Sequence, residues 1–139
     1  MKCLMLGMGM LLLAASPLAG AASGSWSSAS YGGTLTHGKQ RLKSRPVQST
    51  GALPQHASAE TLQWQIKMDG PAPQGLRLQF CSVSRCVPLP AQQGEITLPA
   101  GFPAAGPFHF EYFSIRRGPL QPPLTVLSNQ VTIGYQVKR

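Results

Sequence analysis

Two short runs of alternating apolar and polar residues constrain the fold most. In the run 62–68 (LQWQIKM) every second residue is apolar, and the same holds in the run 76–80 (LRLQF). A period of two is typical of a β-strand with one buried face. The residues between the runs, 69–75 (DGPAPQG), are turn-forming types. We therefore expect a β-hairpin, followed by a short, proline-bracketed edge strand at 87–89.

Five other stretches predict strands, and none predicts a long helix. These strands are expected at 34–36, 95–98, 108–115, 124–127 and 131–137. The chain has 13 prolines and 15 glycines, and no stretch repeats with a period of 3.6 residues. This pattern predicts a single all-β domain of about 7–9 short strands, either an antiparallel, immunoglobulin-like β-sandwich or a partly open barrel.

The strand at 108–115 (FHFEYFSI) is the most aromatic part of the chain. It should place Phe108, Phe110 and Tyr112 on one face. Two other segments show no strand pattern. Residues 47–60 are expected to form a loop, and residues 23–31 to pack through Trp26 and Tyr31 or to stay mobile.

The chain begins with a predicted signal peptide, residues 1–21. Lys2 precedes an apolar run at 4–15, and the small residues that follow suit signal peptidase. A membrane-spanning helix would need ~20 apolar residues, and this run is shorter. We expect cleavage after residue 21, with the next alanine as the alternative. The exported part would be a single β-rich domain, residues 22–139.

Cleavage would leave two cysteines, Cys81 and Cys86. An oxidising compartment and an even cysteine count favour a disulfide between them. A zinc site would need four ligands in paired spacing, and a thioredoxin-like site would need Cys-x-x-Cys. Neither pattern is present, so we predict a structural disulfide, no metal and no cofactor.

The chain is strongly basic, with a net charge of +8 at neutral pH. Lys39, Arg41, Lys43 and Arg45 recur with a period of two, so an extended chain would align them along one edge. One interpretation is an edge strand protected from pairing, and the other is an electrostatic docking strip. For an exported protein the partner would be an anionic envelope surface, a glycan or an acidic protein face, and not nucleic acid.

The sequence shows no catalytic constellation. The acidic residues are Glu60, Asp69, Glu95 and Glu111. None forms a close pair for general acid–base chemistry, and no nucleophile-elbow, zinc-protease or phosphate-loop motif occurs. The histidines (His37, His56 and His109) lack metal-ligand spacing. His109 and Glu111 would share one strand face and could pair, which is a structural role. We therefore predict a non-enzymatic protein.

Several motifs resemble one known family. They are the stretch 64–87 (WQIKMDGPAPQGLRLQFCSVSRCV), GTLTH at 33–37, LSNQV at 127–131, and the aromatic residues Trp26 and Tyr135. Together they resemble the flagellar protein FlhE family over essentially the whole exported chain. The loops at 39–60 and 92–119 depart from the family pattern. The resemblance therefore does not make the basic strip (Lys39, Arg41, Lys43 and Arg45) a feature of the family.

The resemblance implies a periplasmic β-rich protein that assists flagellar assembly. Such a protein would limit proton leakage through the export apparatus, or act as a chaperone for flagellar rod subunits. Its partners would be export-gate or rod proteins, and we expect a monomer. The alternative is a small cationic module that binds the envelope or a glycan. The candidate interaction surface comprises Trp26, Tyr31, Lys39, Arg41, Lys43, Arg45, Phe113, Arg116 and Arg117.

Overall fold

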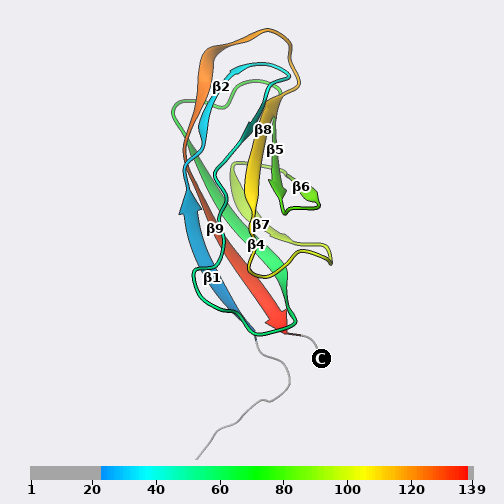
Figure 1. Ribbon diagram of the computed structural model, residues 1–139. Helices are drawn as coiled ribbons and strands as arrows, with labels where there is room; N and C mark the ends of the chain where they lie inside the picture. The colour runs from blue at the N-terminus through cyan, green and yellow to red at the C-terminus, as the bar shows by residue number, and fades with distance from the viewer. Residues whose placement is uncertain (1–22, 138–139) are drawn as a thin grey trace, which may run out of the picture.

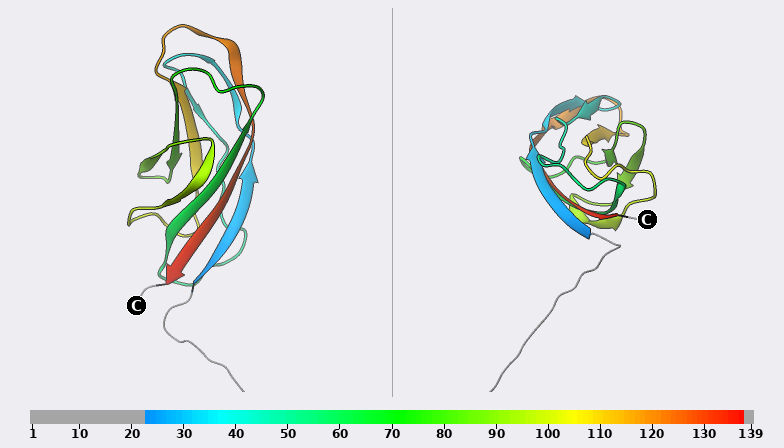
Figure 2. Two further views of the ribbon diagram at one scale, coloured as in Figure 1. Left: turned by 180° about the vertical axis from the view of Figure 1, so that it is seen from behind. Right: turned by 60° about the horizontal axis from the view of Figure 1, so that its bottom comes forward.

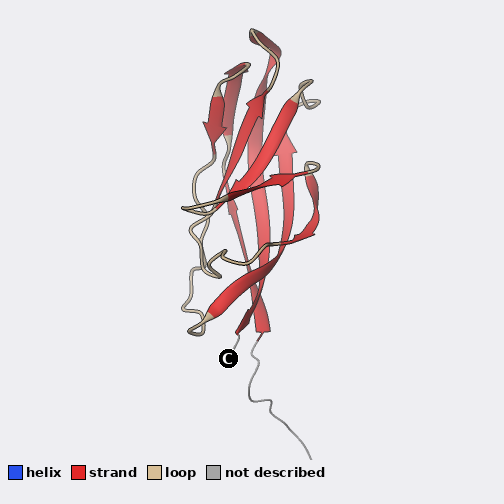
Figure 3. Cartoon of the chain, turned by 90° about the vertical axis from the view of Figure 1, so that its right-hand side faces the viewer, coloured by secondary structure: helices blue, strands red, loops and turns tan. Residues whose placement is uncertain are grey.

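The computed structural model describes residues 23–137, which form nine β-strands and no helix (Figures 1 and 3). The predicted signal peptide lies outside these residues. The strands are β1 (Ser23–Ser30), β2 (Gly33–His37), β3 (Arg41–Lys43), β4 (Ala57–Met68), β5 (Leu76–Cys81), β6 (Cys86–Leu89), β7 (Gln93–Thr97), β8 (His109–Ser114) and β9 (Pro119–Val137).

The strands form two antiparallel sheets that face each other (Figure 2). Sheet A has the order β1-β9-β4-β7, and β2 also pairs with β9. Sheet B has the order β3-β8-β5-β6. The predicted antiparallel sandwich is therefore confirmed, although β4 and β9 are longer than expected, and the predicted edge position of the 87–89 strand is confirmed by β6.

Strand β9 runs the length of the molecule and organises sheet A (Figure 1). Its first half pairs with β2, its second half pairs with β1, and β4 lies along its other side. The sequence predicted two separate strands here, and that was wrong. Pro122 and Pro123 lie before Val126, where the pairing with β4 ends, so their missing N–H groups interrupt no β4 ladder.

The predicted hairpin was also wrong. The run 62–68 belongs to β4 in sheet A, whereas the run 76–80 belongs to β5 in sheet B. The turn between them, 69–75, therefore carries the chain from one sheet to the other. The period of two correctly identified both strands and their buried faces, but it contains no information about which strands pair.

Two segments that showed no strand pattern are partly in strands. Residues 57–60 form the start of β4, which pairs with the end of β9. The predicted 47–60 loop is therefore shorter than expected. Residues 23–30 form β1, which pairs with β9 along its whole length. Their small side chains gave no apolar alternation, because Trp26 is the only large apolar residue among them that packs against the core.

The core lies between the sheets and is dominated by aromatic rings. Phe108, Phe110 and Tyr112 are completely buried, which confirms the predicted inward face of the 108–115 strand. Phe80 of β5 packs on Phe108, with ring centroids 4.8 Å apart. Trp26 closes one side of this cluster, and its indole N–H donates to the carbonyl of Ala104 at 2.7 Å.

Candidate functional site

The outer face of sheet B carries a row of arginine, phenylalanine and arginine. In the strand register, Arg41 of β3 lies opposite Phe113 of β8, and Phe113 lies opposite Arg77 of β5. Tyr112 points into the core, so its neighbour Phe113 points outward. The Arg41 guanidinium lies over the Phe113 ring, 4.4 Å from its centroid. The row therefore combines a flat apolar surface with two flanking cations.

The next row of this face contains a buried carboxylate, Glu111, between Lys43 and Gln79. Only 9% of the Glu111 side chain is exposed. Arg41 Nη1 donates to its Oε1 at 2.8 Å, and His109 Nε2 donates to its Oε2 at 2.8 Å. The predicted pairing of His109 with Glu111 is thus confirmed.

The same contacts set the protonation of Glu111. Burial by itself raises the pKa of this carboxyl group, but the hydrogen bonds from His109 and Arg41 outweigh burial and hold the pKa below its ordinary value. Glu111 is therefore ionised near neutral pH. Its charge is compensated within the protein by Arg41.

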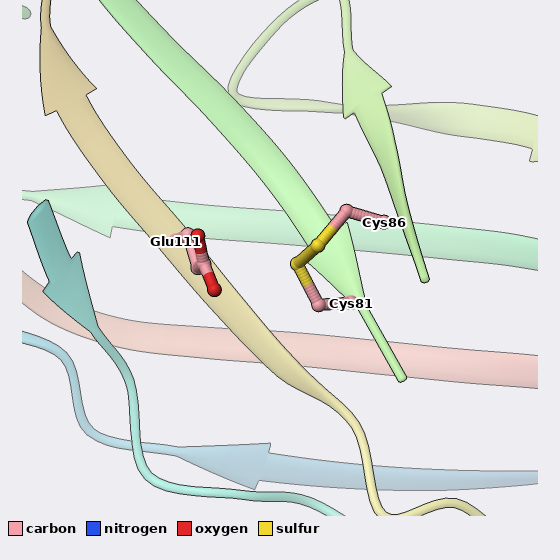
Figure 4. A group of neighbouring side chains, drawn as sticks. All are labelled: Cys81, Cys86 and Glu111. Atoms are coloured by element: carbon pink, nitrogen blue, oxygen red, sulfur yellow. A yellow bond between two sulfur atoms is a disulfide. The ribbon is translucent and has the colours of Figure 1, made fainter. Parts of the chain in front are cut away.

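The disulfide lies beside Glu111 (Figure 4). Cys81 on β5 and Cys86 on β6 are bonded to each other, as predicted, and they are directly paired residues in the sheet. Their sulfur atoms and a Glu111 oxygen lie within 4.8 Å of one another. This group does not offer a metal site, because the two sulfurs are consumed by the bond. Its role is to clamp the turn between β5 and β6.

Two cations of this face have no acidic partner in the part of the chain that the structure describes. The ion pairs found there both involve Glu111, through Arg41 and His109. Lys43 and Arg77 are exposed, and Arg77 donates only to the backbone carbonyl of Leu76, at 3.3 Å. The outer face of sheet B therefore carries an uncompensated positive charge.

The basic strip predicted from the sequence is not a continuous row. Arg41 and Lys43 lie in β3, an edge strand of sheet B, as one of the two interpretations expected. Lys39 lies in the preceding turn with a φ of 67°, and Arg45 lies beyond the strand. Sequence reasoning missed Arg77 as the third cation of this face. The alternating pattern of the run 76–80 placed Arg77 on the polar side of a strand. Only the pairing of β5 with β8 brings Arg77 beside Phe113.

The remaining predicted residues lie elsewhere. Arg116 and Arg117 are exposed in the turn between β8 and β9, at the end of the molecule where β9 begins (Figure 1). Tyr31 is 74% exposed just after β1, whereas Trp26 is half-buried in the sandwich. The predicted set is therefore divided among the outer face of sheet B, this end turn and β1.

Strand β1 forms an open edge of sheet A. Within residues 23–137 it pairs with β9 alone, so its second side has no strand partner. Its eight residues, SGSWSSAS, include no charged residue and no proline. Proteins commonly protect exposed edges with lysine, proline or a bulge. β1 has neither lysine nor proline, and its register with β9 is regular.

The described residues show no convergent catalytic group. A hollow over β4, β7 and β9 is lined by amide and hydroxyl side chains, including Gln63, Gln65 and Gln130, and in this part of the chain Glu95 is its only titratable residue. Among the same residues, no helix is long and apolar enough to cross a membrane.

The fold and these surfaces define a small antiparallel β-sandwich with one cationic outer face and one open sheet edge. Residues 32–136 match the family described as Flagellar protein FlhE. The chain belongs to this family. It is 35% identical over 116 residues to the Flagellar protein FlhE of Escherichia coli, covering 84% of this chain and 88% of that protein.

Other relatives agree. The Flagellar protein FlhE of Salmonella typhimurium is 34% identical over 126 residues, covering 91% of this chain and 95% of that protein. The solved structure titled "Crystal Structure of FLHE" superposes with a TM-score of 0.74 at 33% identity, covering 81% of this chain and 96% of that chain. The similarity therefore extends to the fold as well as the sequence.

Proposed function

We propose that this protein is a periplasmic, non-enzymatic accessory factor of flagellar assembly. It binds extended segments of flagellar rod or export-gate proteins, keeps rod subunits from associating in the periplasm, and limits proton leakage through the export apparatus. Membership of the flagellar protein FlhE family supports the flagellar role. The open edge of β1 is the observation that supports a binding mechanism.

An open strand edge presents backbone N–H and C=O groups that an extended partner segment satisfies by adding a strand. β1 offers eight residues for this pairing. The exposed side chains of Ser23, Ser25, Ser27 and Ala29 are small. These small side chains leave room for an approaching chain. Because they carry no charge, the edge can pair with segments of varied sequence.

Strand addition also explains how a small protein without a catalytic site could act as a chaperone. A subunit segment that pairs with β1 is unavailable for pairing with another subunit. Release would need only the loss of the added strand, because the sandwich core behind β1 does not change. Docking to an export-gate protein through the same edge would place the factor at the export apparatus, where proton leakage occurs.

The test is to block β1 with the charges that protected edges carry. The variant Ser25→Lys with Ala29→Lys places two cations on β1. The matched control, Gln93→Lys with Thr97→Lys, places two cations on β7, the opposite edge of sheet A. Each variant is expressed in a strain that lacks the gene, and periplasmic crosslinking to rod proteins, motility and cytoplasmic pH are measured.

We expect the β1 variant to lose rod-protein crosslinks and to restore neither motility nor the cytoplasmic pH, while the β7 variant restores all three. If the β1 variant is as active as the β7 variant, strand addition at β1 is wrong. If the wild-type protein crosslinks to no flagellar protein, the proposed accessory role is wrong.

A further inference from the structure

We propose that the outer face of sheet B is a second binding surface, which holds an acidic segment of a protein partner. The segment would lie across Phe113, with its carboxylates on Arg77 and Lys43. This inference rests on the proposed function in one respect, which is that the partner is a protein. It concerns a different sheet from β1, so the two proposals are separately testable.

The outer faces of the two sheets differ in charge. On sheet B, Arg77 and Lys43 remain without a carboxylate partner among the described residues, and the one acid, Glu111, is already engaged. The outer face of sheet A is different, because hydroxyl and amide groups dominate it. Ser27 shares a 2.7 Å hydrogen bond with Thr132, and this neutral row continues through the neighbouring strand, β4. An acidic ligand is therefore attracted to one side of the sandwich.

The internal neutralisation of Glu111 is what leaves this face positive. A bare carboxylate in the centre of the face would repel an acidic ligand. Here Arg41 and His109 both donate to Glu111, and its side chain is almost completely covered. The arrangement keeps the strand surface flat and leaves Lys43 and Arg77 available for an external anion.

The spacing of the groups suits an extended peptide. Adjacent strands are about 4.8 Å apart, so Arg41 and Arg77 are roughly 10 Å apart across Phe113. Lys43 lies one row further along, roughly 7 Å, so Lys43 and Arg77 are diagonal neighbours roughly 12 Å apart, which is close to the separation of side chains four positions apart in an extended ligand. Guanidinium groups bind carboxylates through two parallel hydrogen bonds. The part of the Phe113 ring that Arg41 leaves exposed would accept an apolar side chain between the acidic ones.

A membrane surface is the less suitable occupant. Electrostatic attachment to anionic lipid typically uses clusters of roughly four to eight basic residues. This face supplies three, and one of them, Arg41, is already paired with Glu111. A protein segment adds the apolar contact with Phe113 that a headgroup layer does not provide.

The test measures binding of a fluorescent peptide with ten glutamates and a central phenylalanine, by anisotropy in low salt. The variant Lys43→Glu with Arg77→Glu removes the free cations of the face. The matched control, Lys67→Glu with Arg117→Glu, makes the same change in net charge at exposed residues outside this face. A peptide with glutamines in place of the glutamates measures binding that does not depend on charge, and vesicles of phosphatidylglycerol measure lipid binding.

We expect the face variant to weaken binding of the acidic peptide at least tenfold, and the control variant to change it less than threefold. The glutamine peptide should not bind, and added salt should weaken binding of the acidic one. Thermal melts check that each variant is folded. If the charge reversal unfolds the protein, the neutral variant Lys43→Gln with Arg77→Gln is used in its place. We expect this variant to weaken binding of the acidic peptide by a smaller factor.

Equal losses in the face and control variants would overturn the proposal, because net charge alone would then explain binding. Binding of vesicles but not of the acidic peptide would overturn it in favour of a membrane surface. The β1 variant Ser25→Lys with Ala29→Lys should still bind the peptide. This readout separates failure of the sheet B surface from failure of strand addition at β1.

Discussion

The hydroxyl of Tyr112 donates a hydrogen bond to Oδ1 of Asn129 across the sandwich interior. Tyr112 lies on β8 in sheet B and Asn129 on β9 in sheet A, and both are completely buried. Burial raises the pKa of the Tyr112 hydroxyl far above its ordinary value, so the group stays protonated and remains a donor. One polar contact thereby joins the two sheets inside an apolar core.

The variant Tyr112→Phe should destabilise the protein by about 1–3 kcal/mol, because it leaves the buried Oδ1 of Asn129 without a donor. Nδ2 of Asn129 already has no hydrogen-bond partner among the described residues. Urea unfolding measures the change. The double variant Tyr112→Phe with Asn129→Leu should be more stable than Tyr112→Phe alone, because neither polar group then remains. A double variant that is less stable than the single one would contradict this account.

Removing the disulfide should lower the melting temperature by several degrees. Cys81 and Cys86 are five residues apart, and closing so short a loop contributes roughly 1–2 kcal/mol by limiting the unfolded chain. The measurement compares the melting temperature of the double variant, which carries both Cys81→Ser and Cys86→Ser, with that of the oxidised wild type. Reductant should lower the melting temperature of the wild type and leave that of the double variant unchanged. Identical melts of the wild type with and without reductant would disprove the stabilisation.

Glu111→Gln should reduce stability near neutral pH by about 1–2 kcal/mol, because hydrogen bonds to the charged carboxylate are lost. The folded pKa of Glu111 lies below its ordinary value of 4.5. The stabilisation is therefore fully present above pH 4.5 and disappears as the pH falls through the lowered folded pKa.

The measurement for Glu111→Gln is urea unfolding of the wild type and the variant between pH 7 and pH 3. The difference between them should be constant down to about pH 4.5 and should shrink below it. Glu95→Gln, which changes an exposed carboxylate on sheet A, is the control. A Glu111→Gln difference that grows in acid would show that the carboxylate is not stabilised by its partners.

Gly38→Ala should destabilise the protein by about 2–3 kcal/mol, since a Cβ there overlaps the backbone. That Cβ would lie 1.5 Å from the carbonyl oxygen of Arg116, and the Gly38 N–H donates to the Gly118 carbonyl at 2.7 Å. Neither backbone atom can move independently of its turn. Gly51→Ala is the matched control, because a Cβ at Gly51 meets nothing within 4 Å. Thermal melts of the two variants should differ clearly, and equal melts would refute the predicted clash.

The features predicted correctly from the sequence are local ones. Alternation identified most strands and the buried face of Phe108, Phe110 and Tyr112. The cysteine count and the expected compartment indicated the disulfide. These features depend on the chemistry of a few neighbouring residues, which is why a single sequence is sufficient for them.

The features that were missed depend on which strands become neighbours. Strand β4 pairs with β7 and β9 and not with β5, because pairing is decided by contacts across the whole chain. The cationic face was incomplete for the same reason, as Arg77 joins Arg41 only through their shared neighbour, β8. Asn129 gave no signal either, since it lies in the polar run 128–130 (SNQ), and polar residues are mostly exposed.

The length and pairing of β9 also determine when the molecule can fold. The partners of β9 along one side, β1 and β2, come from the beginning of the described chain, whereas β9 ends at Val137. Among the described strands β9 is the last along the chain, so sheet A has no central strand until β9 has joined it. Contacts between residues so far apart in sequence form slowly. Before β9 joins, β1 exposes both of its edges, so the unfolded chain is itself the kind of extended segment that a β-strand chaperone would bind.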